Sequence, residues 1–131
     1  MIFDSDSQIR RVYLDVPHSE NPKPSWYGES VGHYEGDTLV VDTIGQNTKT
    51  VLDAYRTPHS EKLHTVERWR MIDGGKTLEV VVTIDDPETF NQSWQGRRLY
   101  RRGQAQMSEQ YCAENNFFFD YGIPKSEKPD F

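Results

Sequence analysis

The chain has 131 residues, enough for one hydrophobic core and too few for two, so we expect a single β-barrel domain over residues 1–131, with a frayed tail at 124–131. The formal net charge is −6 and the pI is near 5.1, which argues against nucleic acid or an anionic membrane as a partner. Cys112 is the one cysteine, which excludes an intramolecular disulfide and a cysteine-rich metal site.

The chain carries no sign of membrane insertion. No apolar run approaches the roughly 18 residues that a membrane span needs, and no signal-peptide pattern opens the sequence. Read from Met1, the protein is expected to be cytoplasmic. If Met1 replaces a removed signal peptide, it is expected to be periplasmic or secreted.

Apolar and polar residues alternate with a period of two through much of the chain, which predicts strands. The first strand is expected at 9–14. A loop with three prolines follows at 16–28, and Trp26 is expected to anchor it to the core. Next comes a hairpin of strands 30–34 and 38–44, joined by a tight turn in which Gly36 supplies a positive φ.

The second half predicts four further strands. A long strand is expected at 62–71, a turn at 73–76, the strongest strand at 77–84, and two more at 97–102 and 106–112. Aromatic residues at 117–119 and 121 should fold back on the body, because exposed phenylalanines favour aggregation. About seven short antiparallel strands predict an all-β fold, either a small antiparallel barrel or a barrel-like sandwich of the lipocalin-like kind. An odd strand number leaves an open edge, so a homodimer is expected.

The tetrapeptide Pro-His-Ser-Glu occurs twice, at 17–20 and at 58–61, and all four histidines precede residue 65. Imidazole titrates near neutral pH and is a common metal ligand. Two interpretations stay open: either the repeat is turn chemistry used twice, or His18 and His59 converge on one site. His59 and His64 are the stronger candidate pair, because only a short connection separates them.

Strand parity sorts the polar side chains of the long strand at 62–71. His64 shares one face with the arginines at 68 and 70, while Glu67 and Trp69 share the other face with apolar residues. That second face has the composition of a cavity wall with one carboxylate suited to acid–base chemistry. Asp42, between apolar neighbours, is either a buried acid or a strand-end cap. Glu79 is expected to be solvated.

The leading hypothesis is an enzyme of the lyase or isomerase type that needs no cofactor. It would carry out an elimination, hydration, isomerisation or cyclisation on a small, partly apolar organic molecule. Glu67 or Asp42 would be the base, and His64 and His59 would be the acid or the oxyanion stabiliser. Five aromatic residues are the candidate substrate contacts: Tyr34, Trp69, Trp26, Trp94 and Tyr100.

Two alternatives remain open at this point. The first is a non-catalytic barrel that binds a small ligand through the same aromatic residues. The second is a metal enzyme or carrier in which His18, His59 and His64 bind Zn or Cu. The arginines at 97, 98, 101 and 102 are expected to be solvated and paired with the acidic excess.

Two long segments carry a resemblance to a known group of proteins. They are GESVGHYEGDTLVVDTIGQN at 28–47 and PHSEKLHTVER at 58–68. Together they resemble a family of uncharacterised bacterial proteins with a GHSVGxWEGDTLVVDT signature followed by PH(S/T)xxLHxxER. This chain has Glu29 where the signature has His, and Tyr34 where it has Trp. The resemblance implies a related fold and no mechanism.

Overall fold

The computed structural model describes residues 1–3 and 8–104, and the prediction of an all-β fold is confirmed there. Apart from one 3₁₀ turn, η2 (Asp73–Gly75), the regular structure of these residues is β-strand. The strands are β1 (Ile2–Phe3), β2 (Gln8–Ile9), β3 (Tyr13–Leu14), β4 (Glu29–Glu35), β5 (Thr38–Ile44), β6 (His64–Ile72), β7 (Thr77–Asp85) and β8 (Trp94–Arg101). None of the described residues forms a helix long and apolar enough to cross a membrane.

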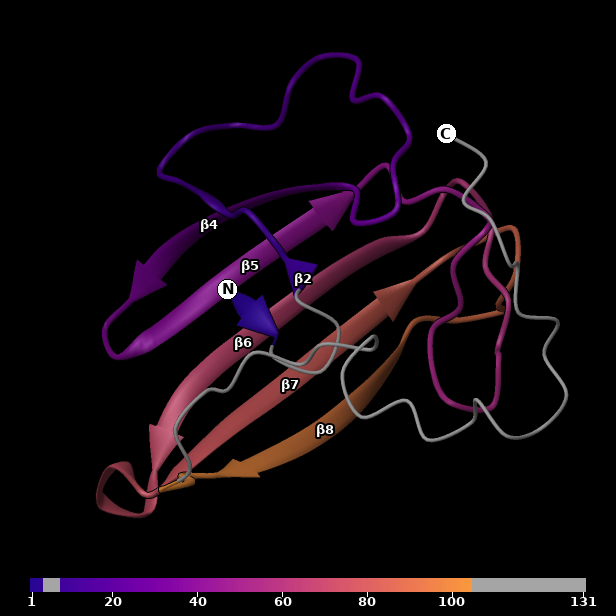
Figure 1. Cartoon of the computed structure of the whole chain (residues 1–131). Coiled ribbons are helices and arrows are strands. Elements are labelled where there is room, and N and C mark those ends of the chain that lie inside the picture. Colours follow the sequence, from indigo (N-terminus) through magenta and orange to yellow (C-terminus); the bar gives the residue numbers. More distant parts are fainter. Residues whose placement is uncertain (4–7, 105–131) are drawn as a thin grey trace, which may run out of the picture.

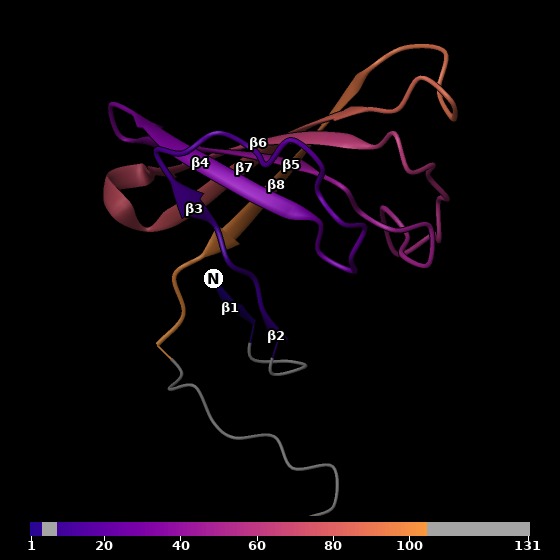
Figure 2. The ribbon, with the colours of Figure 1, turned by 90° about the horizontal axis from the view of Figure 1, so that it is seen from above.

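Six strands form one mixed sheet in the order β3-β4-β5-β6-β7-β8, and β1 and β2 form a separate hairpin. The sheet is strongly twisted (Figure 1), and the β1-β2 hairpin lies on one side of it (Figure 2). Within the described residues β3 and β8 do not pair, so the sheet is open. Of the two predicted forms, these strands are therefore consistent with the barrel-like sandwich rather than the closed barrel.

The N-terminal strand differs from its prediction. The expected strand at 9–14 is divided, because β2 pairs with β1 while β3 pairs with β4. The β3-β4 pair is parallel, which was not expected. Parallel neighbours need a long crossover connection, and the loop at 15–28, which arcs beyond the edge of the sheet in Figure 1, provides it. The predicted strand at 106–112, the aromatic tail at 117–121 and the frayed end at 124–131 lie outside the described residues.

Two glycines explain the local geometry of β4. Gly36, at the turn between β4 and β5, has a φ of 58°, as predicted for a tight hairpin connection. Gly32 lies where a Cβ atom would come within 2.9 Å of the Val40 carbonyl and 3.0 Å of the Val12 side chain. The missing side chain therefore lets the segment around Val12 pack closely over the sheet.

Alternation along the strands gives the sheet two faces, which we call inner and outer. On the inner face Val41, Glu67 and Val82 lie side by side across β5, β6 and β7. The next row across the same strands lies on the outer face and contains Arg68, one residue further along β6. Val41 and Ile84 are among the most buried apolar side chains, so most of the core lies against the inner face.

Candidate functional site

A cavity of about 580 Å³, the inner cavity, lies against the inner face of β6, β7 and β8. Alternate residues of β6 (65–69), β7 (80–84) and β8 (94–100) line it together with Arg97. Arg10, Tyr27 and the loop at 46–53 close it at the side. The register confirms the predicted parity of β6, since Thr65, Glu67 and Trp69 share this face while His64 lies on the other. The expected cavity wall with one carboxylate on β6 is therefore present.

Glu67 is held in an ion pair at the floor of this cavity. Its Oε2 lies 2.6 Å from Nη1 of Arg10, and both side chains are largely buried. Arg10 also donates hydrogen bonds to Ser30 Oγ at 3.1 Å and to Thr43 Oγ1 at 2.7 Å. One guanidinium thus ties β4, β5 and β6 together. The carboxylate that was expected to be the base lies in an ion pair with it, and its Oε2 makes no hydrogen bond of good geometry to the described residues.

Trp69 lines the cavity and also carries a hydrogen-bond donor that no described residue uses. Its Nε1 is buried and has no hydrogen-bond partner among the described residues. Trp94 and Tyr100 also line the cavity, and Trp94 packs edge-to-face against Phe90 with ring centroids 5.8 Å apart. Three of the five predicted aromatic contacts, Trp69, Trp94 and Tyr100, therefore come together.

The other two aromatic candidates lie elsewhere. Trp26 is 58% exposed in the loop, so it is not the core anchor that was expected, and it lines a separate hollow with Tyr27. Tyr34 is 64% exposed at the far end of β4. Both residues were assigned from residue type alone, which does not tell a pocket aromatic from a surface one.

Asp42 lies between two imidazoles on the outer face. Its Oδ1 is 2.9 Å from Nε2 of His18 and 2.9 Å from Nε2 of His64. Nδ1 of His18 is 3.1 Å from Oε1 of Glu29. A carboxylate only accepts hydrogen bonds. For His18 to bond to both Glu29 and Asp42, each of its two ring nitrogens must therefore carry a proton. The loop at 15–28 is fastened to the sheet through this arrangement, which we call the outer histidine cluster.

Hydrogen bonding decides the charge state of the two acids in this cluster. Desolvation raises the pKa of Asp42, but the hydrogen bonds from His18 and His64 outweigh it, and the net pKa is lowered. The hydrogen bonds from the Ser19 side chain and backbone are the main cause of the lowered pKa of Glu29. Both groups are therefore carboxylates at neutral pH, with Asp42 half-buried rather than serving as a strand-end cap.

His59 is a buried histidine with its own partners, 6% exposed. Its Nδ1 donates to the carbonyl of Ser60 at 2.8 Å, and its Nε2 lies 2.7 Å from the Thr50 hydroxyl. The Thr50 hydroxyl also donates to the Asn47 carbonyl at 3.1 Å, so the imidazole is tied into the loop before β6. The predicted pair of His59 with His64 is not formed, because His64 is bonded to Asp42 on the sheet.

The repeated tetrapeptide builds the same device twice, a serine that holds a carboxylate through two hydrogen bonds. Ser19 donates its N–H to Glu29 at 2.7 Å and its hydroxyl at 2.6 Å. Ser60 donates both groups to Asp86, each at 2.7 Å. We call each arrangement a carboxylate clamp. The interpretation of the repeat as turn chemistry used twice is therefore the correct one, and His18 and His59 face different partners.

Asp86 is a structural residue that sequence reasoning missed. It is 1% exposed, and its backbone carbonyl accepts hydrogen bonds from the N–H groups of Thr89 and Phe90. Desolvation raises the pKa of its carboxyl, but the hydrogen bonds of Ser60 and the neighbouring turn outweigh it and lower the pKa to about 2. The sequence signal near it is Asp-Asp-Pro at 85–87, which is typical of a strand end and does not identify a partner.

The arginine-rich strand β8 follows its prediction in part. Arg97 pairs with Glu79 at 2.6 Å, and Arg70 holds the same carboxylate from β6. Glu79 is consequently 3% exposed, not solvated as expected, because two guanidinium groups cover it. On the other face of β8, Arg98 lies over the ring of Tyr100, 5.5 Å from its centroid.

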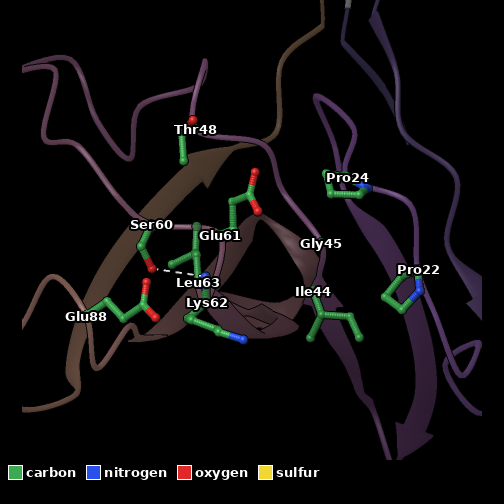
Figure 3. Close-up of a pocket in the computed structure, with 10 residues that line it drawn as sticks. All are labelled: Pro22, Pro24, Ile44, Gly45, Thr48, Ser60, Glu61, Lys62, Leu63 and Glu88. Atoms are coloured by element: carbon green, nitrogen blue, oxygen red, sulfur yellow. Dashed lines mark hydrogen bonds between the residues drawn. The ribbon is translucent and has the colours of Figure 1, made fainter.

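A second hollow of about 640 Å³ opens at the end of the sheet (Figure 3). The prolines of the loop at 15–28 lie on one side of it, and the turn that contains Ser60 lies on the other. Its charged side chains, at positions 61, 62 and 88, are exposed, and none of the predicted aromatic contacts reaches it. This hollow therefore contributes none of the predicted substrate contacts.

The predicted catalytic and metal-binding sets are thus divided. Glu67 lies on the inner face, Asp42 and His64 on the outer face, and His59 in a separate turn. Over residues 1–3 and 8–104, no group of three or more His, Cys, Asp or Glu side chains is arranged to hold a metal ion. The set of His18, His59 and His64 does not come together, since His59 has its own partners.

Comparisons of the chain with models of protein families, with curated proteins and with solved structures found no significant match.

Proposed function

We propose that the protein binds a small, partly aromatic organic molecule in the inner cavity. The observation that carries this proposal is the gathering of Trp69, Trp94 and Tyr100 in the wall of a 580 Å³ cavity. Ligand sites in proteins commonly have volumes of about 300–1,000 Å³ and combine apolar walls with a few polar groups. Aromatic rings supply a large apolar contact area, so an aromatic ligand would pack against this wall.

Binding accounts for the inner face better than catalysis does. Acid–base chemistry needs a free base and a partner acid on the same side of the sheet. Here Glu67 is engaged by Arg10, and the predicted acids, His64 and His59, lie on the outer face and in a separate turn. The groups that do gather in the cavity, besides the engaged carboxylates, are aromatic rings and arginines, which bind rather than transfer protons.

Fluorescence titration with 1-anilinonaphthalene-8-sulfonate, an aromatic probe of hydrophobic cavities, tests the proposal. Trp94→Ala, which opens the wall, should weaken binding by about tenfold, in keeping with the removal of an aromatic contact. Trp26→Ala is the matched control, because Trp26 lies outside the cavity and should leave the affinity unchanged. No binding by the wild type, or equal effects of the two substitutions, would contradict the proposal. Thermal unfolding confirms that each variant is folded.

One observation favours a second candidate, proton-transfer chemistry on the outer face. Asp42 orients His64 through Nε2, and Nδ1 of that imidazole has no hydrogen-bond partner in the described part of the chain. An imidazole oriented by a carboxylate is a common arrangement for a general base. This candidate predicts that His64→Gln abolishes any turnover found in a screen of small organic acids while probe binding in the inner cavity persists.

We also propose that a second copy of the chain is a partner. β8 presents an edge of eight residues with no strand beyond it among the strands described, whereas the opposite edge strand, β3, has two residues. A long open edge is suited to pairing with another strand. Light scattering should return the mass of a dimer at micromolar concentration, and a monomer mass would contradict this assignment.

A further inference from the structure

We infer that a proton on His18 fastens residues 16–24, which we call the strap, to the outer face of the sheet, and that the strap is released when the pH rises and this proton is lost. The strap is thus a pH-sensitive element of the fold. It is attached to the face opposite the inner cavity, so it is separate from the ligand proposed for that cavity.

Both ring nitrogens of His18 are in contact with carboxylates. Nδ1 lies 3.1 Å from Oε1 of Glu29 on β4, and Nε2 lies 2.9 Å from Oδ1 of Asp42 on β5. A neutral imidazole has one N–H and one lone pair, so it can donate to only one of these acids, and its lone pair then lies against an oxygen of the other. The doubly protonated ring donates to both, and its positive charge lies between two negative charges. Loss of one proton therefore replaces an attractive contact of the strap by a repulsive one.

The other charged groups around this ring do not share its dependence on two protons. Glu29 and Asp42 are already carboxylates at neutral pH, as described above. His64 of β6 contacts the same oxygen of Asp42 at 2.9 Å, but it contacts that acid alone, so a single N–H is enough for its hydrogen bond. Asp85 of β7 lies opposite His64 in the strand register and is exposed. His18 is therefore the group whose charge decides how the strap is held.

The strap has few other attachments to the sheet. Backbone hydrogen bonds of Asp15 and Ser25 hold the chain just before and just after it. Between these two points, the hydrogen bonds from strap to sheet within the described residues all come from His18 and Ser19, and Ser19 binds the same Glu29 that His18 contacts. Most strap residues are exposed, so apolar burial adds little to the attachment. Weakening the contacts of His18 therefore lowers the free energy needed to lift the strap from the sheet.

The second copy of the repeated tetrapeptide lacks this device. His59 contacts a hydroxyl and a backbone carbonyl instead of two acids, and Ser60 holds Asp86 without a contact from that histidine. Glu20 and Glu61, the last residues of the two copies, are both exposed. The chain therefore presents the same four residues twice, once beside the proton-dependent contacts and once away from them.

Limited proteolysis with a glutamate-specific protease compares the two copies within one molecule. Cleavage after Glu20 requires the strap to leave the sheet, whereas cleavage after Glu61 reports how pH affects the protease on the same tetrapeptide. The ratio of the first rate to the second, measured from fragment masses, should rise about tenfold between pH 6 and pH 8.5, as expected for the loss of one hydrogen bond between charged groups. A ratio that is unchanged, or that falls, would overturn the inference.

Two variants identify the group that titrates. His18→Gln does not titrate, so its ratio should be the same at both pH values. His33→Gln is the matched control, because His33 lies on the same strand as Glu29 and has an acid partner of its own, Glu35, and it should keep the tenfold rise. A rise that persists in His18→Gln, or that is lost in His33→Gln, would assign the titration to another group and overturn the inference. Circular dichroism confirms that each variant is folded, and the wild-type ratio tests the inference without any variant.

Discussion

Replacing Asp86 by Asn should destabilise the protein by about 2 kcal/mol at pH 7. The carboxyl is almost completely buried and accepts two hydrogen bonds from Ser60. Its pKa falls from the ordinary value of 3.8 to about 2 in the folded protein. A pKa difference of this size between the unfolded and folded states corresponds to about 2 kcal/mol, since each pKa unit is about 1.4 kcal/mol. Asn keeps the shape but presents an NH₂ group to one of the two donors of Ser60.

The sign of the pH dependence follows from the lowered pKa. A carboxyl with a depressed folded pKa stabilises the protein fully above its unfolded value, and this contribution is lost as the pH falls toward the folded value. The difference in the free energy of unfolding between wild type and Asp86→Asn should therefore be largest at pH 7. At pH 3 it should fall to about half of that value. At neutral pH, the loss of unfolding free energy in Asp86→Asn should lower the Tm by roughly 5–10 °C for a domain of this size.

Urea unfolding followed by tryptophan fluorescence at pH 7 and pH 3 measures both effects. Asp85→Asn is the matched control, because it changes the same charge one residue away, at an exposed side chain, and should stay within about 0.5 kcal/mol of wild type. A variant as stable as wild type at pH 7 would refute the reasoning. So would a destabilisation that is the same at both pH values, since it would show that the clamp does not act through the charge of Asp86.

Two further predictions concern the histidines and their partner acid. His59→Ala should lower the free energy of unfolding by about 2–3 kcal/mol, because it empties a buried site and leaves the partners of the ring unpaired. His64→Gln, at a more exposed side chain, should cost less than about 1 kcal/mol, and the reverse order in urea unfolding would be inconsistent with these environments. Asp42→Asn should loosen the loop at 15–28, because it removes the charge that holds His18, and should speed cleavage after Glu20 by a glutamate-specific protease. Asp37→Asn, in the turn at the far end of the sheet, should leave that cleavage rate unchanged.

The fold was predictable from the sequence where period-two alternation is long and the turn residues are distinctive. Residues 38–44 and 77–84 satisfy both conditions, and β5 and β7 occupy them almost unchanged. Parity along β6 also placed Glu67 and Trp69 on one face before any strand pairing was known. The two-residue strand β3 and its parallel pairing were not predictable, because a short strand is formed by the path of a distant loop rather than by its own pattern.

The partners of the polar residues were the harder part of the site. The sequence singled out the repeat, but the pairs considered were His18 with His59 and His59 with His64, and neither the histidines nor the serines were connected to distant acids. His18 meets Asp42 across 24 residues, and Ser60 meets Asp86 across 26. Such contacts depend on the strand register and on loop paths. For the same reason Glu79 was expected in solvent, although Arg70 and Arg97 cover it from both sides.

The two carboxylate clamps lie at the same end of the sheet. Glu29 is the first residue of β4, and Asp86 directly follows the last residue of β7; the antiparallel register places both at the end where β5 finishes and β6 begins. The opposite end has the two hairpin connections, at Gly36 and η2, and neither contains such a device. Local opening of the sheet should therefore start at the hairpin end and travel toward the clamps. Amide hydrogens of the central strands would then exchange in a gradient, fastest beside the hairpins and slowest beside Ser60.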